Sequence, residues 1–527
     1  LVGSEMCIRD SSSRVLSIHA PRTMHWQSEV LPVRRESTSQ DKLGYGISFT
    51  ETDVTQNPSG KEPLYHAQLH CASDTTRNSL QAAAAHLRAG ELVAFPTETV
   101  YGLGACALKN DAAAKIYAAK SRPADNPLIV HVSDRRMLER LLPPGYKPNA
   151  VCETLLRAFW PGPLTLLFPA RSEASHEPAV PPIVTCGQPT VGVRMPSHPL
   201  ARALIHMADM PVAAPSANAS GRPSPTTAGH VFDDLGRRGS LKYILDGGPS
   251  TVGVESTVID AVSVPGEVRV LRPGGVSVEQ LADALAAHGL LRMADGAKPE
   301  AVTLRVYGKD LARSKEAELA PTTPGMKYRH YSPEARVVLA RFEENTKQGA
   351  SLSQLIKAQL DALRVNAHGA TPDNAMTQRR QTGPFRVGVM CALDSPLASL
   401  VRQLATDEGQ QSLGQWADAQ LAEDRASDPA VATDGTQRVS PVVPSASKDF
   451  CCCIYSLGCL SKPQLAAQHL FDGLRTLDSA VQWADGATPQ NTCDLILVEA
   501  ISEQGVGLAV MNRLQKAASD TNTISSV

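Results

Sequence analysis

Polar side chains gather in proline- and glycine-rich segments that follow predicted strands, which is where α/β proteins place their ligands. The segment 96–104 follows one such strand and holds two threonines, a glutamate and two glycines. Further along, Lys120 and Arg122 stand two residues apart just after a predicted helix, with Asn126 and His131 beyond them. A solvated helix end would explain the two cations about as well as a phosphate clamp does. The four polar residues together favour the clamp.

Arg194 ends an apolar segment that we expect to be a strand, where its charge needs a partner. A ligand carboxylate would provide that partner. Small hydrogen-bond donors and acceptors then crowd into the loop 214–227, and the segments 255–260 and 271–275 add further polar groups. Together these segments predict a site for a ligand with anionic groups.

The length and the charge balance limit the classes of protein to consider. The chain has 527 residues, 51 Lys plus Arg against 53 Asp plus Glu, and a formal net charge of -2. This length predicts more than one domain, because single cores stop growing at roughly 250–300 residues. The near-neutral charge gives no argument for a dedicated nucleic-acid or membrane-surface protein. No stretch approaches the roughly 18 apolar residues of a membrane helix, so we expect no membrane contact.

The cysteines point to a reducing compartment. All 11 are scattered without a CxxC pair, and the run 451–453 is too tight for a disulfide framework. We therefore expect a cytoplasmic protein without a zinc site. Arginines in residues 14–35 have some transit-peptide character, but Glu29 and Glu36 interrupt it, so mitochondrial targeting has only weak support.

Helix and strand patterns alternate through the segment that carries the polar residues, which predicts an α/β domain over residues 72–291. Predicted helices cover 75–88, 111–119, 151–159, 199–208, 226–235 and 277–288. Predicted strands cover 92–95, 128–132, 164–168, 191–194, 212–214, 243–245, 257–259 and 268–271. Gly90 is placed to end the first helix, Asn110 to cap the second, and Ser277 with Gln280 forms a capping box.

The C-terminal part repeats the α/β class on a smaller scale, over residues 334–519. Predicted strands cover 336–339, 385–390, 452–456 and 495–499, and predicted helices lie near 353–364, 463–483 and 507–518. The last helix places Leu508, Met511 and Leu514 on one face, which is more typical of a core than of a binding site. Segments near 343–384 and 404–450 have the composition of insertions. Residues 1–65 lack an apolar period, so we predict a disordered extension.

The polar segments, taken in order, resemble the Sua5/YrdC/YwlC family of threonylcarbamoyl-AMP synthases. The matching blocks are PTETVYGLG from residue 96, KSRP from 120, NPLIVHV from 126, WPGPLT from 160, VGVRMPSHP from 191, PSAN from 215, SGRPSPT from 220, ESTVID from 255 and RPGG from 272. One block alone is weak evidence, but the ordered series is specific. PGMKYRHYSP from 324 and GLAVMNRL from 507 are similar to the long Sua5 form. The resemblance implies a YrdC-like twisted-sheet catalytic domain followed by a smaller Rossmann-like domain.

The family condenses L-threonine, bicarbonate and ATP into threonylcarbamoyl-AMP, pyrophosphate and water. Its product supplies N6-threonylcarbamoyladenosine (t6A) at position 37 of ANN-decoding tRNAs, through a downstream threonylcarbamoyl transferase complex. The resemblance implies that threonine is held by Thr99, His131, Arg194, Ser216 and Ser256. It implies that ATP is held by Lys120, Arg122, Asn126, Thr190, Asn218, Thr226, Arg272 and Tyr331. Lys120 and Arg122 would be the catalytic pair, and Mg²⁺ would accompany the nucleotide without a protein metal site.

The sequence contains no nucleophile with an adjacent base, so catalysis would rest on positioning and charge neutralisation. A competing interpretation is a module that binds double-stranded RNA or tRNA, with Lys120, Arg122, Arg194 and Arg272 on phosphates. The shell of Thr, Ser and Asn favours the enzyme. A carbamoyltransferase that acts on a protein would carry zinc fingers, which need CxxC pairs.

The segment 292–333 is predicted to link the two domains. Residues 327–331 place a lysine, two tyrosines, an arginine and a histidine in succession, which is unusual for an inert spacer. We hypothesise that this part folds over the cleft as a lid, with Tyr331 on ATP and Lys327 or Arg329 near the phosphates. A proline-stiffened linker with a solvated basic face is the alternative.

Overall fold

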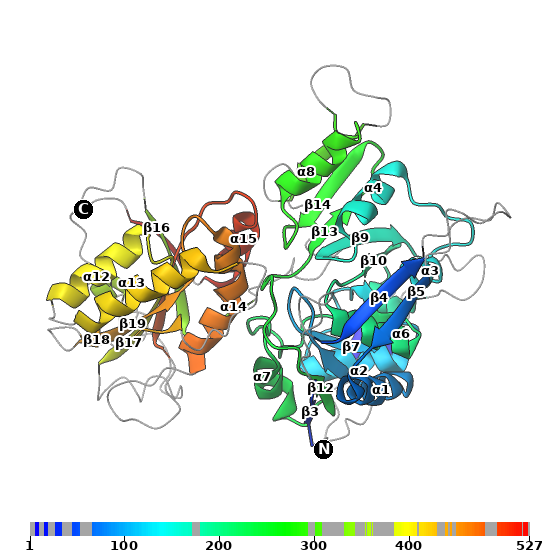
Figure 1. Cartoon of the computed structure of the whole chain (residues 1–527), viewed down its shortest axis with the longest axis horizontal. Coiled ribbons are helices and arrows are strands. Elements are labelled where there is room, and N and C mark those ends of the chain that lie inside the picture. Colours follow the sequence, from blue (N-terminus) through cyan, green and yellow to red (C-terminus); the bar gives the residue numbers. More distant parts are fainter. Residues whose placement is uncertain are drawn as a thin grey trace. The chain divides into compact units, whose positions relative to one another are not determined.

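The computed structural model divides the chain into two units, Leu1–Tyr328 and Arg329–Val527, which are coloured along the sequence in Figure 1. The described residues are 6–9, 15–18, 27–33, 45–52, 66–170, 180–292, 301–307, 331–342, parts of 352–361, 384–407, 411–428, 438–440, 443–444, 449–479, 493–518 and 520–524. Within them, no helix combines the length and the hydropathy that a bilayer span requires.

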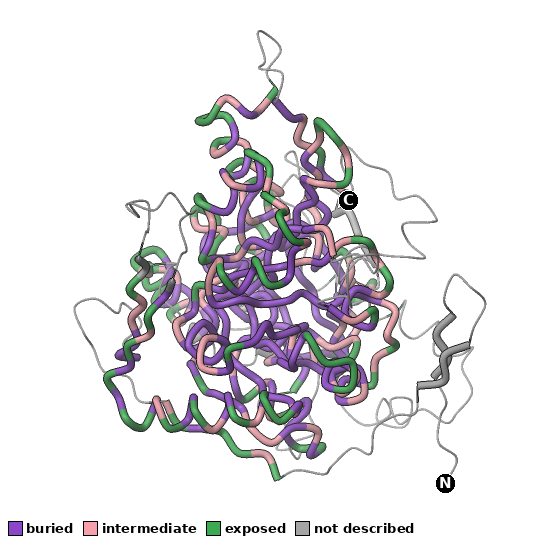
Figure 2. The backbone as a smooth tube through the Cα atoms, turned by 90° about the vertical axis from the view of Figure 1, so that its right-hand side faces the viewer, coloured by how far each residue is buried: buried purple, intermediate pink, exposed green. Residues whose placement is uncertain are grey.

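The first unit is built on a mixed sheet whose strand order is β15-β14-β13-β9-β10-β8-β11-β7-β6-β12-β3. The strands are β3 (Glu29–Leu31), β6 (Val93–Phe95), β7 (Gly102–Cys106), β8 (Val130–His131), β9 (Leu164–Pro169), β10 (Thr190–Arg194), β11 (Val212–Ala213), β12 (Tyr243–Leu245), β13 (Thr257–Asp260), β14 (Glu267–Arg272) and β15 (Thr303–Val306). Most strand residues are buried, and Figure 2 shows the buried backbone gathered in the interior. The strand order places strands that are distant in sequence next to each other, and this brings the polar strand ends together.

Helices pack on this sheet in pairs, α1 against α6 and α4 against α8 (Figure 1). They are α1 (Asp74–Arg88), α2 (Asn110–Lys120), α3 (Arg135–Glu139), α4 (Ala150–Phe159), α5 (Pro182–Thr185), α6 (Pro199–Ala208), α7 (Ala228–Val231) and α8 (Val278–Ala287). A single π-helical turn, Phe232–Gly236, continues α7. The capping box of α8 is confirmed, and Gly90 ends α1 with φ +81°. Asn110 was wrong as a cap, since Lys109 precedes the helix and Asn110 is its first residue.

The prediction that residues 1–65 are disordered is wrong for their described parts. A short pair, β1 (Met6–Arg9) and β2 (Val15–Ile18), forms there. Strand β3 extends the main sheet in parallel with β12, and β4 (Ile47–Thr52) pairs with β5 (His66–Cys71). The Ser28 hydroxyl donates to the carbonyl oxygen of Leu241 at 2.6 Å. The three residues of β3 are too few to show an apolar period, and its partner β12, more than 200 positions later, holds it in place.

The second unit is a smaller sheet in the order β18-β19-β17-β20-β16-β21, parallel except for β18. Its strands are β16 (Arg336–Phe342), β17 (Phe385–Cys391), β18 (Val443–Pro444), β19 (Phe450–Ser456), β20 (Leu495–Glu499) and β21 (Asp520–Ile524). Its named helices are α12 (Pro396–Asp407), α13 (Gln411–Ala426), α14 (Pro463–Ser479) and α15 (Gly507–Ala517). A parallel sheet with covering helices confirms the α/β class expected for the C-terminal part.

The structure bears on two expectations about this unit, the insertion at 404–450 and the buried face of the last helix. Helix α13 lies inside the segment interpreted as an insertion, 404–450, and its buried Asp424 accepts hydrogen bonds from Arg438 and Ser456. The segment therefore contains a helix that carries part of the buried polar structure of the unit, and its being an insertion stays a prediction. The prediction that one face of α15 packs in the core is confirmed for Met511 and Leu514, which are buried. Most of the other expected insertion, 343–384, lies outside the described residues.

Candidate active site

Arg194 lies at the end of β10 and contacts the turn that follows β6. Its Nη1 donates to the Thr99 hydroxyl at 2.9 Å, and its Nε donates to the carbonyl oxygen of Gly162 at 3.2 Å. Its Nη2 lies 2.6 Å from Oε1 of Glu98. The expectation that Arg194 has no partner within the protein is therefore wrong. A buried guanidinium needs a counter-charge, and the turn supplies one through a residue to which the sequence assigned no role.

Local hydrogen bonds stabilise the turn itself. The hydroxyls of Thr97 and Thr99 are 2.7 Å apart, and Thr97 Oγ1 also accepts from the backbone N–H groups of Thr99 and Val100 at 3.2 Å. These local bonds hold the Thr99 hydroxyl toward Arg194. His131 stands beside Arg194 because β8 and β10 run in parallel with these two residues in register. Burial and the neighbouring charge of Arg194 lower the pKa of His131 to about 3, so the imidazole is neutral at physiological pH.

Lys120, the last residue of α2, is buried and only 2% exposed. Its ammonium donates to the carbonyl oxygens of Ser216 and Asn218 and, at 3.3 Å, to Oδ1 of Asn218. The alternative of a solvated helix end is therefore wrong for Lys120, because its ammonium is buried and bonded to the loop carbonyls. Arg122 is half-buried. Lys120 thus stabilises the loop that contains Ser216 and Asn218.

The loop 216–222 is held from both sides. The Asn218 amide donates to the carbonyl oxygens of Ala219 at 2.8 Å and Arg222 at 2.9 Å, and its oxygen accepts from Ser216 and Lys120. The carboxylate of Asp234 accepts from the Ala219 N–H at 3.0 Å and pairs with Arg222 at 3.1 Å. Asp234 is fully buried in the π-helical turn, and its only sequence signal was that it is one of two adjacent acids in an otherwise ordinary helix pattern.

A third group forms where β9, β13 and β14 lie side by side. The hydroxyls of Thr165 and Ser256 are 2.8 Å apart, and Arg272 Nη2 donates to the Ser256 carbonyl oxygen at 2.9 Å and to its hydroxyl at 3.2 Å. Pairing of β13 with both neighbours brings these residues together. Ser256 and Arg272 were both expected at the site, and the structure places them in direct contact.

Backbone hydrogen bonds connect the turn to the loop. The Ala217 N–H donates to the Tyr101 carbonyl oxygen, and the Tyr101 N–H donates to that of Pro225, both at 2.8 Å. The hydroxyl of Ser224 donates to Glu255, next to Ser256, at 2.8 Å. The three groups therefore form one continuous polar region of the first unit.

Four more of the expected site residues have other surroundings. Asn126 is buried, and its Oδ1 accepts no hydrogen bond from the described residues. Thr226 is buried beside His230. Thr190 begins β10, about 13 Å along the strand from Arg194 at about 3.3 Å per residue. Tyr331 belongs to the second unit, where its ring packs 5.1 Å from that of Phe471.

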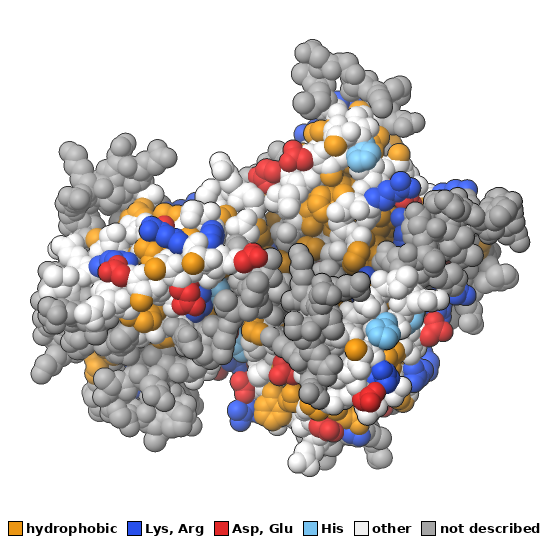
Figure 3. All heavy atoms as spheres, viewed as in Figure 1, with side chains coloured by type: hydrophobic (Ala, Val, Ile, Leu, Met, Phe, Trp, Pro, Cys, Tyr) orange, Lys and Arg blue, Asp and Glu red, His pale blue; other side chains and the backbone are white. Residues whose placement is uncertain are grey.

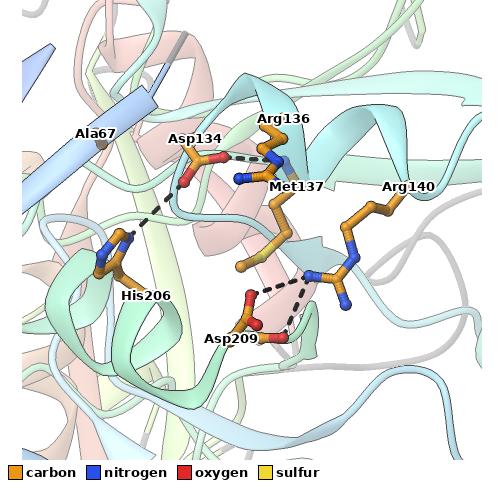
Figure 4. Close-up of a pocket in the computed structure, with 7 residues that line it drawn as sticks. All are labelled: Ala67, Asp134, Arg136, Met137, Arg140, His206 and Asp209. Carbon is orange, nitrogen blue, oxygen red and sulfur yellow. Dashed lines mark hydrogen bonds and ion pairs between the residues drawn. The ribbon is translucent and has the colours of Figure 1, made fainter. Parts of the chain in front are cut away.

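One pocket of the first unit is lined by other residues (Figure 4). It has a volume of about 460 Å³ and is lined by Ala67, Asp134, Arg136, Met137, Arg140, His206 and Asp209. Arg140 pairs with Asp209 at 3.1 Å, and His206 lies 3.8 Å from Asp134. The charged groups of this pocket thus have partners in its own wall. None of the expected site residues lines it.

Comparison with known proteins shows which family the chain resembles. The family model described as telomere recombination, for Sua5, YciO and YrdC, matches residues 85–274, and the model of the threonylcarbamoyl-AMP synthase C-terminal domain matches residues 276–519. The threonylcarbamoyl-AMP synthase of Schizosaccharomyces pombe is 36% identical over 87% of this chain and 93% of that protein. The enzyme of Bacillus subtilis is 37% identical over 83% of this chain and 92% of that protein.

A solved structure extends the likeness to the fold. The crystal structure of Pyrococcus abyssi Sua5 complexed with L-threonine superposes with a TM-score of 0.55 at 32% identity, over 84% of this chain and 96% of that one. The match includes both the YrdC part and the C-terminal part, which confirms the long form. The chain therefore belongs to the threonylcarbamoyl-AMP synthase family, with a YrdC domain followed by a Sua5 C-terminal domain.

Proposed function

We propose that the protein is an L-threonylcarbamoyladenylate synthase, a nucleotidyltransferase that converts L-threonine, bicarbonate and ATP into threonylcarbamoyl-AMP, pyrophosphate and water. One observation carries this proposal. In a chain of this family, the group of Thr99, His131 and Arg194 is connected by backbone hydrogen bonds to the loop that Lys120 holds. The product supplies t6A at position 37 of ANN-decoding tRNAs.

We assign threonine to the group around Arg194, together with Ser216 and Ser256. A guanidinium forms strong charge-assisted hydrogen bonds with a carboxylate, so Arg194 is the anchor for the carboxylate of threonine. The neutral imidazole of His131 offers hydrogen bonds without adding a second positive charge. The Thr99 hydroxyl is already oriented by Arg194. This set suits a small polar amino acid.

ATP is assigned to residues of the first unit, namely Lys120, Arg122, Asn126, Thr190, Asn218, Thr226 and Arg272. The amide of Asn218 makes three hydrogen bonds within the loop and a fourth with Lys120, so its contribution is to shape the loop. Lys120 acts in the same way and adds positive charge, while Arg122 contacts the phosphates. Catalysis then consists of aligning the reactants and neutralising phosphate charge.

Magnesium would arrive with the nucleotide. Among the described residues there is no group of three or more His, Cys, Asp or Glu side chains that could hold a metal ion. The ligands of Mg²⁺ would then be phosphate oxygens and water, which is the usual arrangement for this ion with nucleotides. The protein's part would be to bind the phosphates through Lys120 and Arg122.

The RNA-binding alternative loses much of its support. Lys120, Arg194 and Arg272 are all buried, with their charged groups turned to partners inside the unit. A duplex contacts a protein through exposed cations. Figure 3 shows Lys and Arg mixed with Asp and Glu over the described part of the viewed face. We therefore place the tRNA with a downstream threonylcarbamoyl transferase complex that consumes the product.

The expected domain limits and location are also part of the proposal. We place the catalytic domain at residues 72–291, the linker and lid at 292–333 and the C-terminal domain at 334–519. Residues 327–330 of the lid lie outside the described residues. The ten described cysteines are free thiols, which supports a reducing compartment such as the cytoplasm.

One assay tests the function. The purified protein is incubated with ATP, ¹⁴C-bicarbonate and L-threonine, and pyrophosphate and labelled threonylcarbamoyl-AMP are measured. Both products should appear only when all three substrates are present. Pyrophosphate release that does not depend on threonine would contradict the proposal.

A further inference from the structure

Glu98 is a buried carboxylate whose hydrogen-bonding capacity is unfilled. Its side chain is 7% exposed, and neither of its oxygens accepts a hydrogen bond from the described residues. A carboxylate has room for about four such bonds. Removing it from water without donors is costly, so native structures rarely leave a carboxylate in this state without a reason.

An unfilled donor lies in the same place. Arg194 Nη2 is 2.6 Å from Oε1 of Glu98, yet the two are not aligned as a hydrogen bond, and Nη2 has no other acceptor among the described residues. The other side of the guanidinium is occupied, since Nη1 and Nε bond to Thr99 and Gly162. One donor edge of Arg194 and both acceptors of Glu98 are therefore left side by side.

We propose that Glu98 is a specificity-determining residue that binds the ammonium group of the amino-acid substrate while Arg194 binds its carboxylate. This inference rests on the proposed function. An α-amino acid zwitterion carries three N–H donors and two acceptor oxygens on neighbouring atoms. These groups match an adjacent carboxylate and guanidinium in both charge and hydrogen bonding. An α-hydroxy acid would bring a negative charge to the pair without the positive charge that balances Glu98.

The Glu98–Arg194 pair is shielded from solvent, so a ligand reaches it only when neighbouring side chains move. The charges of the ligand then replace the direct contact between Glu98 and Arg194. A purely structural ion pair makes a different prediction. Breaking it would weaken the binding of every ligand alike through loss of the turn 96–101. Recognition of an ammonium group instead changes the preference between two ligands that differ only at that group.

The test compares L-threonine with the matching 2,3-dihydroxybutanoate, in which a hydroxyl replaces the ammonium, by calorimetry on the full-length protein. The wild type should bind threonine at least roughly 30-fold more tightly, the size of one charge-assisted hydrogen bond. Glu98→Gln should bind threonine roughly 30- to 150-fold more weakly, with little change for the hydroxy acid, so the preference nearly disappears. Glu98→Asp, which keeps the charge, should retain the preference.

Glu91→Gln is the matched control, because Glu91 is also paired in the first unit, with Lys115 at 2.7 Å, and should leave both affinities unchanged. A Glu98→Gln variant that keeps the preference, or loses affinity equally for both ligands, overturns the inference. If that variant does not fold, the wild-type protein alone tests the inference, because equal affinity of the wild type for the two ligands also overturns the inference. The turnover assay on the wild type separates the two claims. Product formation with an unchanged preference in Glu98→Gln refutes only the inference, whereas absence of product refutes the function.

Discussion

Lys120→Met should destabilise the first unit, because the ammonium of Lys120 is the donor for two backbone carbonyls of the loop 216–222. Methionine has nearly the same length but no donor. The carbonyl oxygens of Ser216 and Asn218 would each lose that bond, while Oδ1 of Asn218 would keep the Ser216 hydroxyl. An unsatisfied buried acceptor costs about 1–3 kcal/mol, so two of them cost twice that. Methionine no longer buries a charge, and the desolvation free energy that it saves offsets part of this cost. We expect a loss of about 2–4 kcal/mol in the free energy of unfolding.

The loss is measured by urea unfolding of the full chain together with hydrogen exchange read by mass spectrometry. With a denaturant dependence of about 3 kcal/mol per molar, the midpoint of the first unit should fall by roughly 1 M. Exchange should speed up in peptides that cover 110–131 and 212–226 and stay unchanged in the second unit. Arg122→Ala is the matched control from the same segment. It should cost less than about 1 kcal/mol, since Arg122 is only half-buried.

The reasoning is refuted if Lys120→Met unfolds at the wild-type urea concentration with unchanged exchange. The loop would then find other donors, and the contacts of Lys120 would not hold it. Equal destabilisation by Arg122→Ala would also count against it, because burial would then not be the property that matters.

Four further predictions concern the site. Arg194→Ala should weaken threonine binding by about 2–4 kcal/mol with little effect on ATP, and calorimetry showing equal losses for both ligands would contradict the assignment. Arg122→Ala should abolish threonylcarbamoyl-AMP synthesis while leaving the far-UV spectrum intact, so full turnover would return Arg122 to a solvated surface role. The pKa of His131 is lowered in the folded state, so its contribution to stability is complete above pH 6.5 and decreases as the pH falls toward about 3. Urea unfolding should show this decline, at most about 1.4 kcal/mol per pH unit, in the wild type and not in His131→Gln. Deletion from residue 321 onward should leave a folded first unit with severely reduced threonylcarbamoyl-AMP synthesis. In the full chain, ATP should protect residues 321–333 from protease. Full activity of the truncated protein, together with cleavage that ATP does not slow, would exclude a lid.

The sequence alone determined the helices whose signals are local. Ser277 and Gln280 satisfy the first turn of α8 within three residues, so the pattern for 277–288 placed that helix to within one residue at each end. The periodic apolar faces of α6 and α15 worked in the same way. The family followed from ordered motifs, since each motif is a short stretch whose composition can be read without knowing its neighbours in space. The α/β class followed from the alternation of these elements.

The tertiary structure alone decided which charges are satisfied and by what. Glu98 and Arg194 are far apart in the chain, and the acceptors of Lys120 lie 96 and 98 positions after it, so no local window contains both partners. The same reason explains β3, which has only three residues and owes its place to β12, more than 200 positions later. A charge in a sequence shows that a partner is needed. The pairing of strands then determines whether that partner is another side chain of the protein or a ligand.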